Sequence, residues 1–295
     1  MISPEVSLVL PTQGRRASLF AALRSALAQD FRSLEILVVD DSVGDPGWLV
    51  RPELATCLAD PRVRLVPHHR GQGCAAAKNA GWAAATGRWV CYLDDDNEYL
   101  PGKISAQYSC ALSTASPLVL CGLEIRVGRR RRVHQVNRKE FRGDDLLLGA
   151  HADTNVLFHR RGTPVRWDEE LGTVDDACLF QALIRHYDLT LVPNVPKPLV
   201  IYTAHGGDRA NRGFERFYRG QRRLLVRWSR DYSQTARRVL LLRSLVAFAK
   251  YAPGNWAQFF VTCIRLLRAG GWREWRIAAN ALGVRIPVVR RWMVT

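Results

Sequence analysis

Short apolar segments alternate with helical stretches along the first third of the chain, and this alternation limits the fold more than any other feature. Residues 6–10 and 35–39 fit strands that are buried on both faces, and two further strands are expected at residues 62–67 and 88–93. Leucines at helical spacing follow the first strand, and an alanine-rich helix is expected over about residues 74–85. A strand–helix–strand order with right-handed crossovers predicts an α/β fold, with a Rossmann-like, mostly parallel sheet flanked by helices.

The middle of the chain continues the α/β pattern with less regular spacing. We expect helices over about residues 101–114 and from Asp175 onward. Further strands are expected at residues 117–127, 154–160, 189–193 and 199–205. The arginine-rich stretch 128–135 is expected to form an exposed loop between two of these strands.

The positive charge of the chain is concentrated in its last third. The sequence has a formal net charge of +16, yet residues 209–295 hold 19 basic and only 3 acidic residues, so residues 1–208 are neutral. We therefore expect a globular domain, 1–208, followed by an Arg-rich amphipathic helical extension, 209–295. Its tryptophans mix with cations as in interfacial helices, which favours an anionic membrane surface as a partner. The alternative is a helical lid packed on the domain, and nucleic acid is not expected because no aromatic stacking motif is present.

Cysteine usage and hydropathy favour the cytoplasm. The 7 cysteines show neither a C-x-x-C pair nor a His partner at zinc spacing, so we expect reduced, mostly buried thiols. The first residues fit a strand rather than a signal peptide, and the longest uncharged run, 104–123, is interrupted by Ser, Gln, Thr and Pro. We expect a cytoplasmic protein, and the basic extension leaves open a peripheral position on the cytoplasmic face of the membrane.

Acidic side chains follow two of the expected strands. Asp40 and Asp41 end one strand, and Asp94, Asp95 and Asp96 end another. The carboxyl ends of parallel strands meet at one edge of the sheet, where ligands bind in this class of fold. Three adjacent carboxylates repel one another unless a hard cation such as Mn²⁺ or Mg²⁺ binds them. The alternative is a solvated acidic turn that caps the next helix.

A glycine pattern suggests a second interpretation of the same region. Gly71-x-Gly73-x-x-Ala76 lies between a strand and a helix, with Asp94 about twenty residues further on, as in a nicotinamide-dependent oxidoreductase. Against this interpretation, the glycines lie in the third strand–helix unit rather than the first, and three acids exceed what a ribose needs. A nicotinamide enzyme therefore stays as the alternative function.

Four motifs together resemble the family 2 glycosyltransferases, which are inverting enzymes with the GT-A fold. They are "VSLVLPTQGR" (6–15), "ILVVDDSVGD" (36–45), "AKNAGWAAATGRWVCYLDDDN" (77–97) and "WDEELGTVDDACL" (167–179). Their order and spacing match the family across about the first 208 residues. The resemblance implies a nucleotide-binding half, 1–97, and an acceptor half, 98–208. It also implies transfer of a sugar from a nucleotide-sugar to a hydroxyl of a glycan or glycolipid.

The resemblance assigns roles around the acidic triplet. Asp94–Asp96 corresponds to the Asp-x-Asp signature, which places Asp96 on the metal and Asp94 or Asp95 on the ribose. His205 matches a histidine that completes the metal shell or contacts the diphosphate in relatives. Lys78 stands where the family usually has an arginine, so it keeps the charge for the diphosphate but loses the bidentate fork.

The resemblance also covers the base and the acceptor side. Asp40 would accept a hydrogen bond from an imide N–H, which favours UDP, and Thr12 and Arg15 would contact base or phosphate. Asp175 and Asp176 match the family's Glu-Asp pair, which holds the general base, and the spacing does not decide between them. Trp167 either stacks on an acceptor sugar or anchors its loop in the core. A non-enzymatic protein that binds anionic membranes and has a vestigial site is the remaining alternative.

Overall fold

The computed structural model describes most of the first two thirds of the chain. The described residues are 3–14, 16–43, 52–68, 71–134, 136–143, 145, 153–171, 175–203, and the isolated positions 227, 233, 234, 261 and 264. The chain divides into two compact units, Met1–Glu169 with Asp176–Gly207, and Glu170–Asp175 with Asp208–Thr295. The predicted helical extension lies outside the described residues except at those isolated positions, and so do Arg15 and His205. Within the ranges just given, no helix is both long and apolar enough to cross a membrane.

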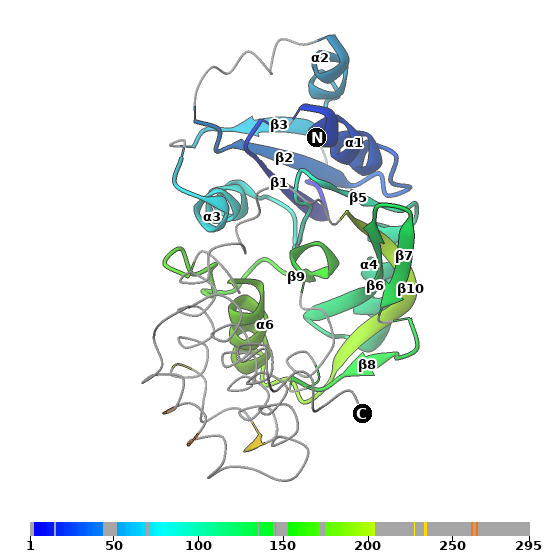
Figure 1. Ribbon diagram of the computed structural model, residues 1–295, viewed down its shortest axis with the longest axis vertical. Helices are drawn as coiled ribbons and strands as arrows, with labels where there is room; N and C mark the ends of the chain where they lie inside the picture. The colour runs from blue at the N-terminus through cyan, green and yellow to red at the C-terminus, as the bar shows by residue number, and fades with distance from the viewer. Residues whose placement is uncertain are drawn as a thin grey trace, which may run out of the picture. The chain divides into compact units, whose positions relative to one another are not determined.

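The first half of the sheet is parallel, as the alternation predicts. Its strands are β1 (Val6–Thr12), β2 (Leu34–Asp40), β3 (Val63–Val66) and β4 (Trp89–Tyr92), in the order β3-β2-β1-β4 (Figure 1). β1 and β4 are buried along their whole length because helices cover both faces of the sheet.

Three helices connect these parallel strands. They are α1 (Arg16–Leu27), α2 (Pro52–Leu58) and α3 (Cys74–Ala84). The crossover through α3 runs back across the sheet, so right-handed connections place α3 on one face, and α1 and α2, which pack together, on the other. The sequence patterns did not predict α2.

The second half of the sheet is mixed. β9 (Phe158–Arg160) pairs antiparallel with β4, and β6 (Leu118–Val127) pairs antiparallel with β9. β10 (Val192–Thr203) then pairs parallel with β6, and β5 (Asn97–Tyr99) closes the row antiparallel to β10. Helix α4 (Lys103–Thr114) packs on β6 and β10. Two antiparallel steps separate β4 from β6, so these two strands point in the same direction.

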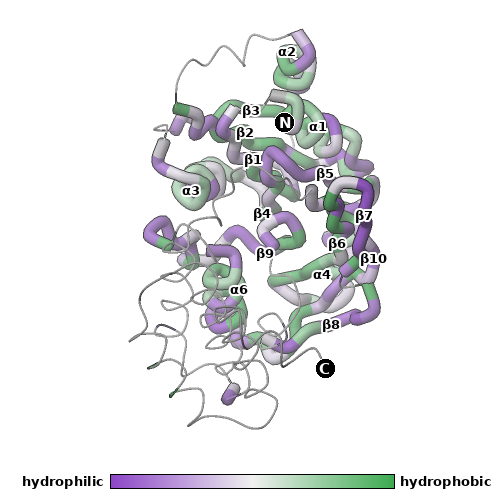
Figure 2. The backbone as a smooth tube through the Cα atoms, viewed as in Figure 1, coloured by the Kyte–Doolittle hydropathy of each residue, from purple (hydrophilic) through white to green (hydrophobic). Residues whose placement is uncertain are grey.

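Three details of the predicted second half were wrong. Residues Thr154–Val156, expected at the start of a strand, form a short 3-10 helix, and the strand itself is β9, Phe158–Arg160. Most of the stretch expected to be a loop is a strand, because Arg130–His134 forms β7, antiparallel to β6 and coloured as hydrophilic in Figure 2. Gly128 supplies the positive φ of 57° that the turn needs, and exposed arginines are compatible with an edge strand. The two late strands are one, β10, whose pairing with β6 shifts register around Pro198. A short strand, β8 (Glu140–Phe141), also pairs with β10.

An aromatic cluster fills the core beneath the end of β4. Trp89 stacks on Phe158 with ring centroids 5.1 Å apart, and Tyr92 meets the ring of Trp167 edge-on at 5.0 Å. Tyr92 also hydrogen-bonds His159 Nε2, while His159 Nδ1 donates to the carbonyl of Arg160. Burial lowers the pKa of His159 to about 4, so it stays neutral and supports the sheet from within. The cysteines among the described residues are free thiols, as expected.

Candidate active site

The carboxyl ends of β1, β2 and β4 bring predicted site residues to one edge of the sheet. Thr12 is level with Asp40 in the ladder between β1 and β2, and the N–H of Asp41 donates to the carbonyl of Thr12 at 2.8 Å. Asp94 follows the last residue of β4 by two positions. The parallel topology therefore gathers acidic groups from strands that are far apart in the sequence.

Asp95 fastens the loop that follows β1. Its carboxylate is 1% exposed and accepts hydrogen bonds from Thr12 Oγ1 at 2.7 Å and from the N–H of Gln13 at 3.2 Å. The N–H of Gly14 in turn donates to Thr12 Oγ1 at 3.0 Å. The side chains of Thr12 and Asp95 are therefore hydrogen-bonded to each other, and together they hold the backbone of residues 12–14, which leads to Arg15.

Asp94 has a different environment from its neighbour. Its carboxylate is about a quarter exposed and lies 3.4 Å from Lys78 Nζ. Lys78 is buried, donates to Thr154 Oγ1 at 3.0 Å and lies 4.3 Å from the centre of the Trp167 ring. The cation is therefore held below the sheet edge, where it offsets the charge of Asp94.

The sequence analysis missed Asp153 and Asn155, which hold Asp94 from the other side. Asn155 Oδ1 accepts the N–H of Asp94 at 2.7 Å, and its Nδ2 donates to Asp94 Oδ2 at 3.3 Å and to Asp153 Oδ1 at 2.7 Å. Burial and the nearby charge of Asp94 raise the pKa of Asp153 to about 6. We call Lys78, Asp94, Asp153, Thr154 and Asn155 the Asp94 cluster. The only signal in the sequence is Asp-Thr-Asn, a typical turn sequence, at the start of an expected strand.

Asp40 and Asp41, at the end of β2, also make different contacts. Asp40 Oδ1 accepts hydrogen bonds from the N–H and hydroxyl of Ser42 at 3.0 and 2.6 Å. Asp41 is buried and accepts the N–H groups of Gln72 at 2.8 Å and Gly73 at 3.0 Å. In a dinucleotide-binding turn such N–H groups point at the pyrophosphate. Here they point at Asp41, which argues against the nicotinamide interpretation.

Asp96 lies in the turn between β4 and β5 and is partly exposed. The neighbouring Asn97 is buried, and its Oδ1 accepts the N–H of Thr203 at 3.0 Å. This bond brings the last described residue of β10 to the acidic turn, two positions before His205 in the sequence. His205 itself lies outside the described residues.

Asp175 and Asp176 open helix α6 (Asp175–His186), as predicted. Both are partly buried, and Asp176 Oδ1 accepts the N–H of Ala177 at 2.7 Å. The helix is anchored by buried Leu179, Phe180 and Leu183. These buried side chains fix the helix that carries the two aspartates. Which of the two acts as the general base stays a prediction.

Trp167 is 2% exposed, so the suggestion that it stacks on an acceptor sugar is wrong. Asn79 holds its backbone: Asn79 Oδ1 accepts the Trp167 N–H at 2.9 Å, and Asn79 Nδ2 donates to the Trp167 carbonyl at 3.0 Å. Trp167 anchors its loop in the core.

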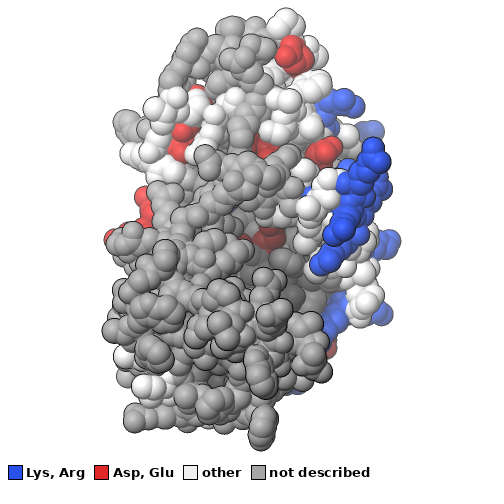
Figure 3. All heavy atoms as spheres, viewed as in Figure 1, with Lys and Arg blue, Asp and Glu red and all other residues white. Residues whose placement is uncertain are grey.

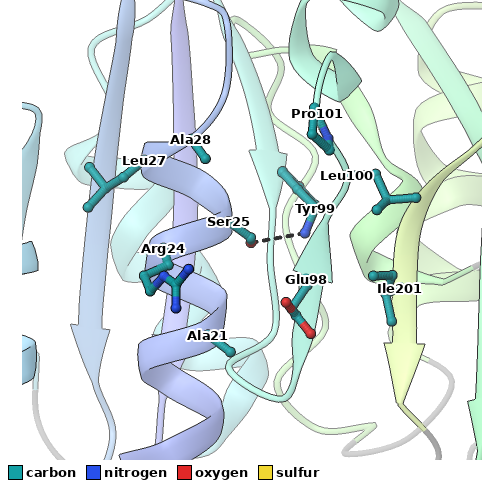
Figure 4. A pocket seen from close by; sticks show the side chains of 10 residues that line it. All are labelled: Ala21, Arg24, Ser25, Leu27, Ala28, Glu98, Tyr99, Leu100, Pro101 and Ile201. Atoms are coloured by element: carbon teal, nitrogen blue, oxygen red, sulfur yellow. Dashed lines mark hydrogen bonds between the residues drawn. The ribbon is translucent and has the colours of Figure 1, made fainter.

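A separate pocket of about 580 Å³ lies between α1 and β5 (Figure 4). Arg24, Ser25 and Glu98 supply polar groups, and Ser25 Oγ accepts the N–H of Tyr99 at 3.0 Å. None of the predicted site residues lines this pocket. The candidate active site is therefore the sheet edge with the Asp94 cluster.

The sequence profile described as Glycosyl transferase family 2 matches residues 7–189, which is more than half of the chain and includes the whole Asp94 cluster. The chain belongs to glycosyl transferase family 2. It is an enzyme of the glycosyltransferase class, and the nicotinamide and non-enzymatic alternatives are both wrong.

Curated relatives of this family 2 glycosyltransferase share part of its length. It is 32% identical over 156 residues to the succinoglycan biosynthesis protein ExoO of Rhizobium meliloti (strain 1021), a match covering 52% of this chain and 44% of that protein. It is 37% identical over 103 residues to a GalNAc(5)-diNAcBac-PP-undecaprenol beta-1,3-glucosyltransferase of Campylobacter jejuni, covering 35% of this chain and 33% of that protein. The matched part is less than half the length of each of these relatives.

Solved structures share the fold of this glycosyltransferase. S. aureus TarS 1-349 in complex with UDP-GlcNAc has a TM-score of 0.65 at 18% identity, covering 97% of this chain and 81% of that one. The mannosyltransferase PcManGT from Pyrobaculum calidifontis, in complex with GDP-Man and Mn²⁺, has a TM-score of 0.57 at 18% identity, covering 100% and 84%. The expected α/β GT-A class is confirmed.

Proposed function

We propose that this glycosyltransferase transfers a sugar from a nucleotide-sugar, with UDP favoured, to a hydroxyl of a glycan or glycolipid, with inversion. The observation that carries the proposal is the gathering of Asp40, Asp94 and Asp96 at the carboxyl edge of one sheet. In open α/β sheets ligands bind at this edge. A UDP-GlcNAc complex of a protein with the same fold supports the choice of donor.

The structure refines the roles proposed for the nucleotide half. Asp40 would accept the imide N–H of uracil. Thr12 and Asp95 bond to each other, so we assign them to holding the loop that leads to Arg15 rather than to direct ligand contact. Asp94 would then accept hydrogen bonds from the ribose, and Lys78 beneath it would supply positive charge for the diphosphate.

The acidic turn suits a hard divalent cation, Mn²⁺ or Mg²⁺. Among the described residues no group of three or more His, Cys, Asp or Glu side chains gathers as a complete metal cage. Such a cage is not required, because Mg²⁺ is commonly held by one or two carboxylates together with substrate phosphates and water. The partly exposed carboxylate of Asp96 is a donor of this kind, and His205 would complete the set. A Mn²⁺ complex of a protein with this fold supports the proposal.

Inversion requires the acceptor oxygen to attack the anomeric carbon from the face opposite the leaving diphosphate. We assign Asp176 as the base that takes the hydroxyl proton while the new C–O bond forms and the sugar–phosphate bond breaks. A bound cation would neutralise charge on the departing nucleotide diphosphate, so no protonated acid is needed there. Asp175 remains the alternative base.

The acceptor and its location are also proposals. A relative named for a diphosphate-linked undecaprenol substrate supports a glycolipid acceptor. Such an acceptor would be presented at a membrane, which agrees with the anionic partner surface expected for residues 209–295. We therefore propose a cytoplasmic enzyme that acts at the cytoplasmic face of the membrane.

Slow hydrolysis of UDP-sugars by the purified protein with Mn²⁺ tests the donor and the metal together. Asp96→Ala should abolish Mn²⁺-dependent UDP binding without loss of stability, because removing one of three crowded carboxylates relieves repulsion. Glu53→Ala, which removes an exposed carboxylate from α2, is the matched control and should bind as the parent protein does. Mn²⁺-dependent UDP binding that survives in Asp96→Ala would show that the metal assignment is wrong.

A further inference from the structure

The hairpin of β6 and β7 carries an unusual density of positive charge. Residues 124–134, here called the basic hairpin, hold arginines at positions 126, 129, 130, 131 and 132, and their one acidic residue is Glu124. Glu124 pairs with Arg126 at 2.6 Å and lies 3.8 Å from Arg131. Among the described residues, Arg129, Arg130 and Arg132 have no acidic partner. Figure 3 shows a row of blue atoms along the side where Figure 1 labels β7.

The topology places the tip of the basic hairpin toward the candidate active site. β6 points in the same direction as β4, because β9 pairs antiparallel with both strands. The carboxyl end of β6 and the turn at Gly128 therefore lie on the same edge of the sheet as Asp40 and Asp94. The arginines project from the edge at which donor and acceptor must meet.

The chemistry of the hairpin fits phosphate groups on an apolar support. The ladder pairs Val127 with Arg130 and Ile125 with Arg132, so these side chains share one face. Val127 is 51% exposed beside the guanidinium groups. Arginine forks bind phosphate oxygens in pairs, and a neighbouring apolar side chain can enter the headgroup layer. No aromatic residue lies between positions 124 and 134, so the hairpin lacks the stacking platform that single-stranded nucleic acid would use.

We propose that the basic hairpin docks on the phosphate headgroups of an anionic lipid surface and so turns the catalytic edge of the sheet toward the membrane. This inference rests on the proposed glycolipid acceptor. It differs from the expectation for residues 209–295, because it places a second contact on the catalytic domain itself. The hairpin orients the enzyme, whereas the extension alone would only tether it.

Two double variants of the full chain test this orientation. Arg130→Gln with Arg132→Gln removes two charges from the hairpin. Arg32→Gln with Arg88→Gln removes two exposed charges from the opposite edge, where β2 and β4 begin. Binding is measured by sedimentation with phosphatidylcholine vesicles, with and without phosphatidylglycerol. The hairpin variant should bind the anionic vesicles on the order of tenfold to thirtyfold more weakly, since each basic residue near an anionic leaflet contributes up to about fivefold.

The control variant should lose less than about twofold, because its charges face away from the lipid. Equal losses in the two variants would overturn the proposal and leave only a general effect of net charge. A hairpin variant that keeps vesicle binding but loses binding of a single-stranded oligonucleotide would overturn it in favour of nucleic acid. Hydrolysis of the UDP-sugar without vesicles should be unchanged in both variants. If the parent protein hydrolyses no UDP-sugar, the proposed function fails, while the vesicle comparison still decides the role of the hairpin.

Discussion

Replacing Asn155 with aspartate changes a single heavy atom between two carboxylates. Asn155 Nδ2 donates to Asp94 Oδ2 at 3.3 Å and to Asp153 Oδ1 at 2.7 Å. An oxygen in its place can donate to neither unless the new carboxyl group is protonated. The variant therefore tests whether Nδ2 of Asn155, rather than Oδ1, faces the carboxylates of Asp94 and Asp153. The hydrogen bonds of the Asp94 cluster depend on this orientation of the amide.

The cost follows from the proton that the new carboxyl group must bind. An aspartate in the unfolded chain has a pKa of about 3.9, so protonating it at pH 7 costs about 4 kcal/mol at about 1.4 kcal/mol per pH unit. The protonated carboxyl group has one O–H, so it can replace only one of the two hydrogen bonds to Asp94 and Asp153. Loss of the second bond, which involves a charged group, costs about 1.5 kcal/mol more. We expect the Asn155→Asp free energy of unfolding to be about 5.5 kcal/mol lower at pH 7. The deficit should shrink toward pH 5, both because the new carboxyl group protonates more easily there and because Asp153, with a pKa of about 6, is then itself largely protonated.

The sign of the pH dependence is the diagnostic result. The folded protein raises the pKa of the new carboxyl group, so it binds more protons than the unfolded chain, and stability falls as the pH rises. Asn155→Ala also loses the side-chain hydrogen bonds but introduces no acid. Its deficit relative to the parent protein should therefore change much less with pH, and only through Asp153, whose pKa the Asn155 amide helps to hold down. Urea unfolding of all three proteins between pH 5 and pH 8 measures the difference. An Asn155→Asp curve that stays parallel to that of the parent protein would refute the orientation of the amide.

Three further changes test other parts of the molecule. Asp176→Asn should keep UDP binding but lower the transfer rate by roughly 10²–10⁴, and Asp175→Asn should act more weakly; the opposite order, measured by single-turnover transfer, would make Asp175 the base. Lys103 is fully buried, its Nζ lies over the Tyr99 ring at 3.8 Å, and burial lowers its pKa. Lys103→Met should raise the free energy of unfolding by about 1–3 kcal/mol, most at low pH where the parent protein must bury the cation; a loss in urea unfolding would mean that the charge is needed. Deleting residues 209–295 should reduce affinity for anionic vesicles in a salt-sensitive way, and salt-independent binding by the truncated protein would exclude the extension as an anchor.

The parallel strands and the acidic edge could be predicted from the sequence for one physical reason. Strands buried on both faces appear as continuous apolar runs, and the acids that end them are adjacent in the sequence. β10 was split in the prediction because Pro193, Pro196 and Pro198 interrupt its pattern, although prolines are tolerated where pairing is irregular. β7 was missed because its arginines carry no apolar alternation.

The partners of Asp94 could not be found by reading along the chain. Asn155 lies 61 positions from Asp94, and only the pairing of β9 with β4 brings its turn to the acidic edge. Both residues also satisfy ordinary turn preferences, so neither stands out locally. The three aspartates of the triplet differ in burial: Asp95 is buried, whereas Asp94 and Asp96 are partly exposed. Three identical residues in a row do not show this difference in the sequence.

The bond between Asp95 and Thr12 affects how inactive variants of the triplet should be interpreted. Loss of the Asp95 carboxylate releases the first loop of the sheet, so such a variant would lose activity through an altered loop without any change in the reacting groups. Loss of the Asp96 carboxylate leaves that support in place. If Asp96 binds the metal as proposed, two neighbouring aspartates would give the same inactive phenotype for unrelated reasons. An alanine scan scored by activity alone would then not separate the residue that supports the loop from the proposed metal ligand.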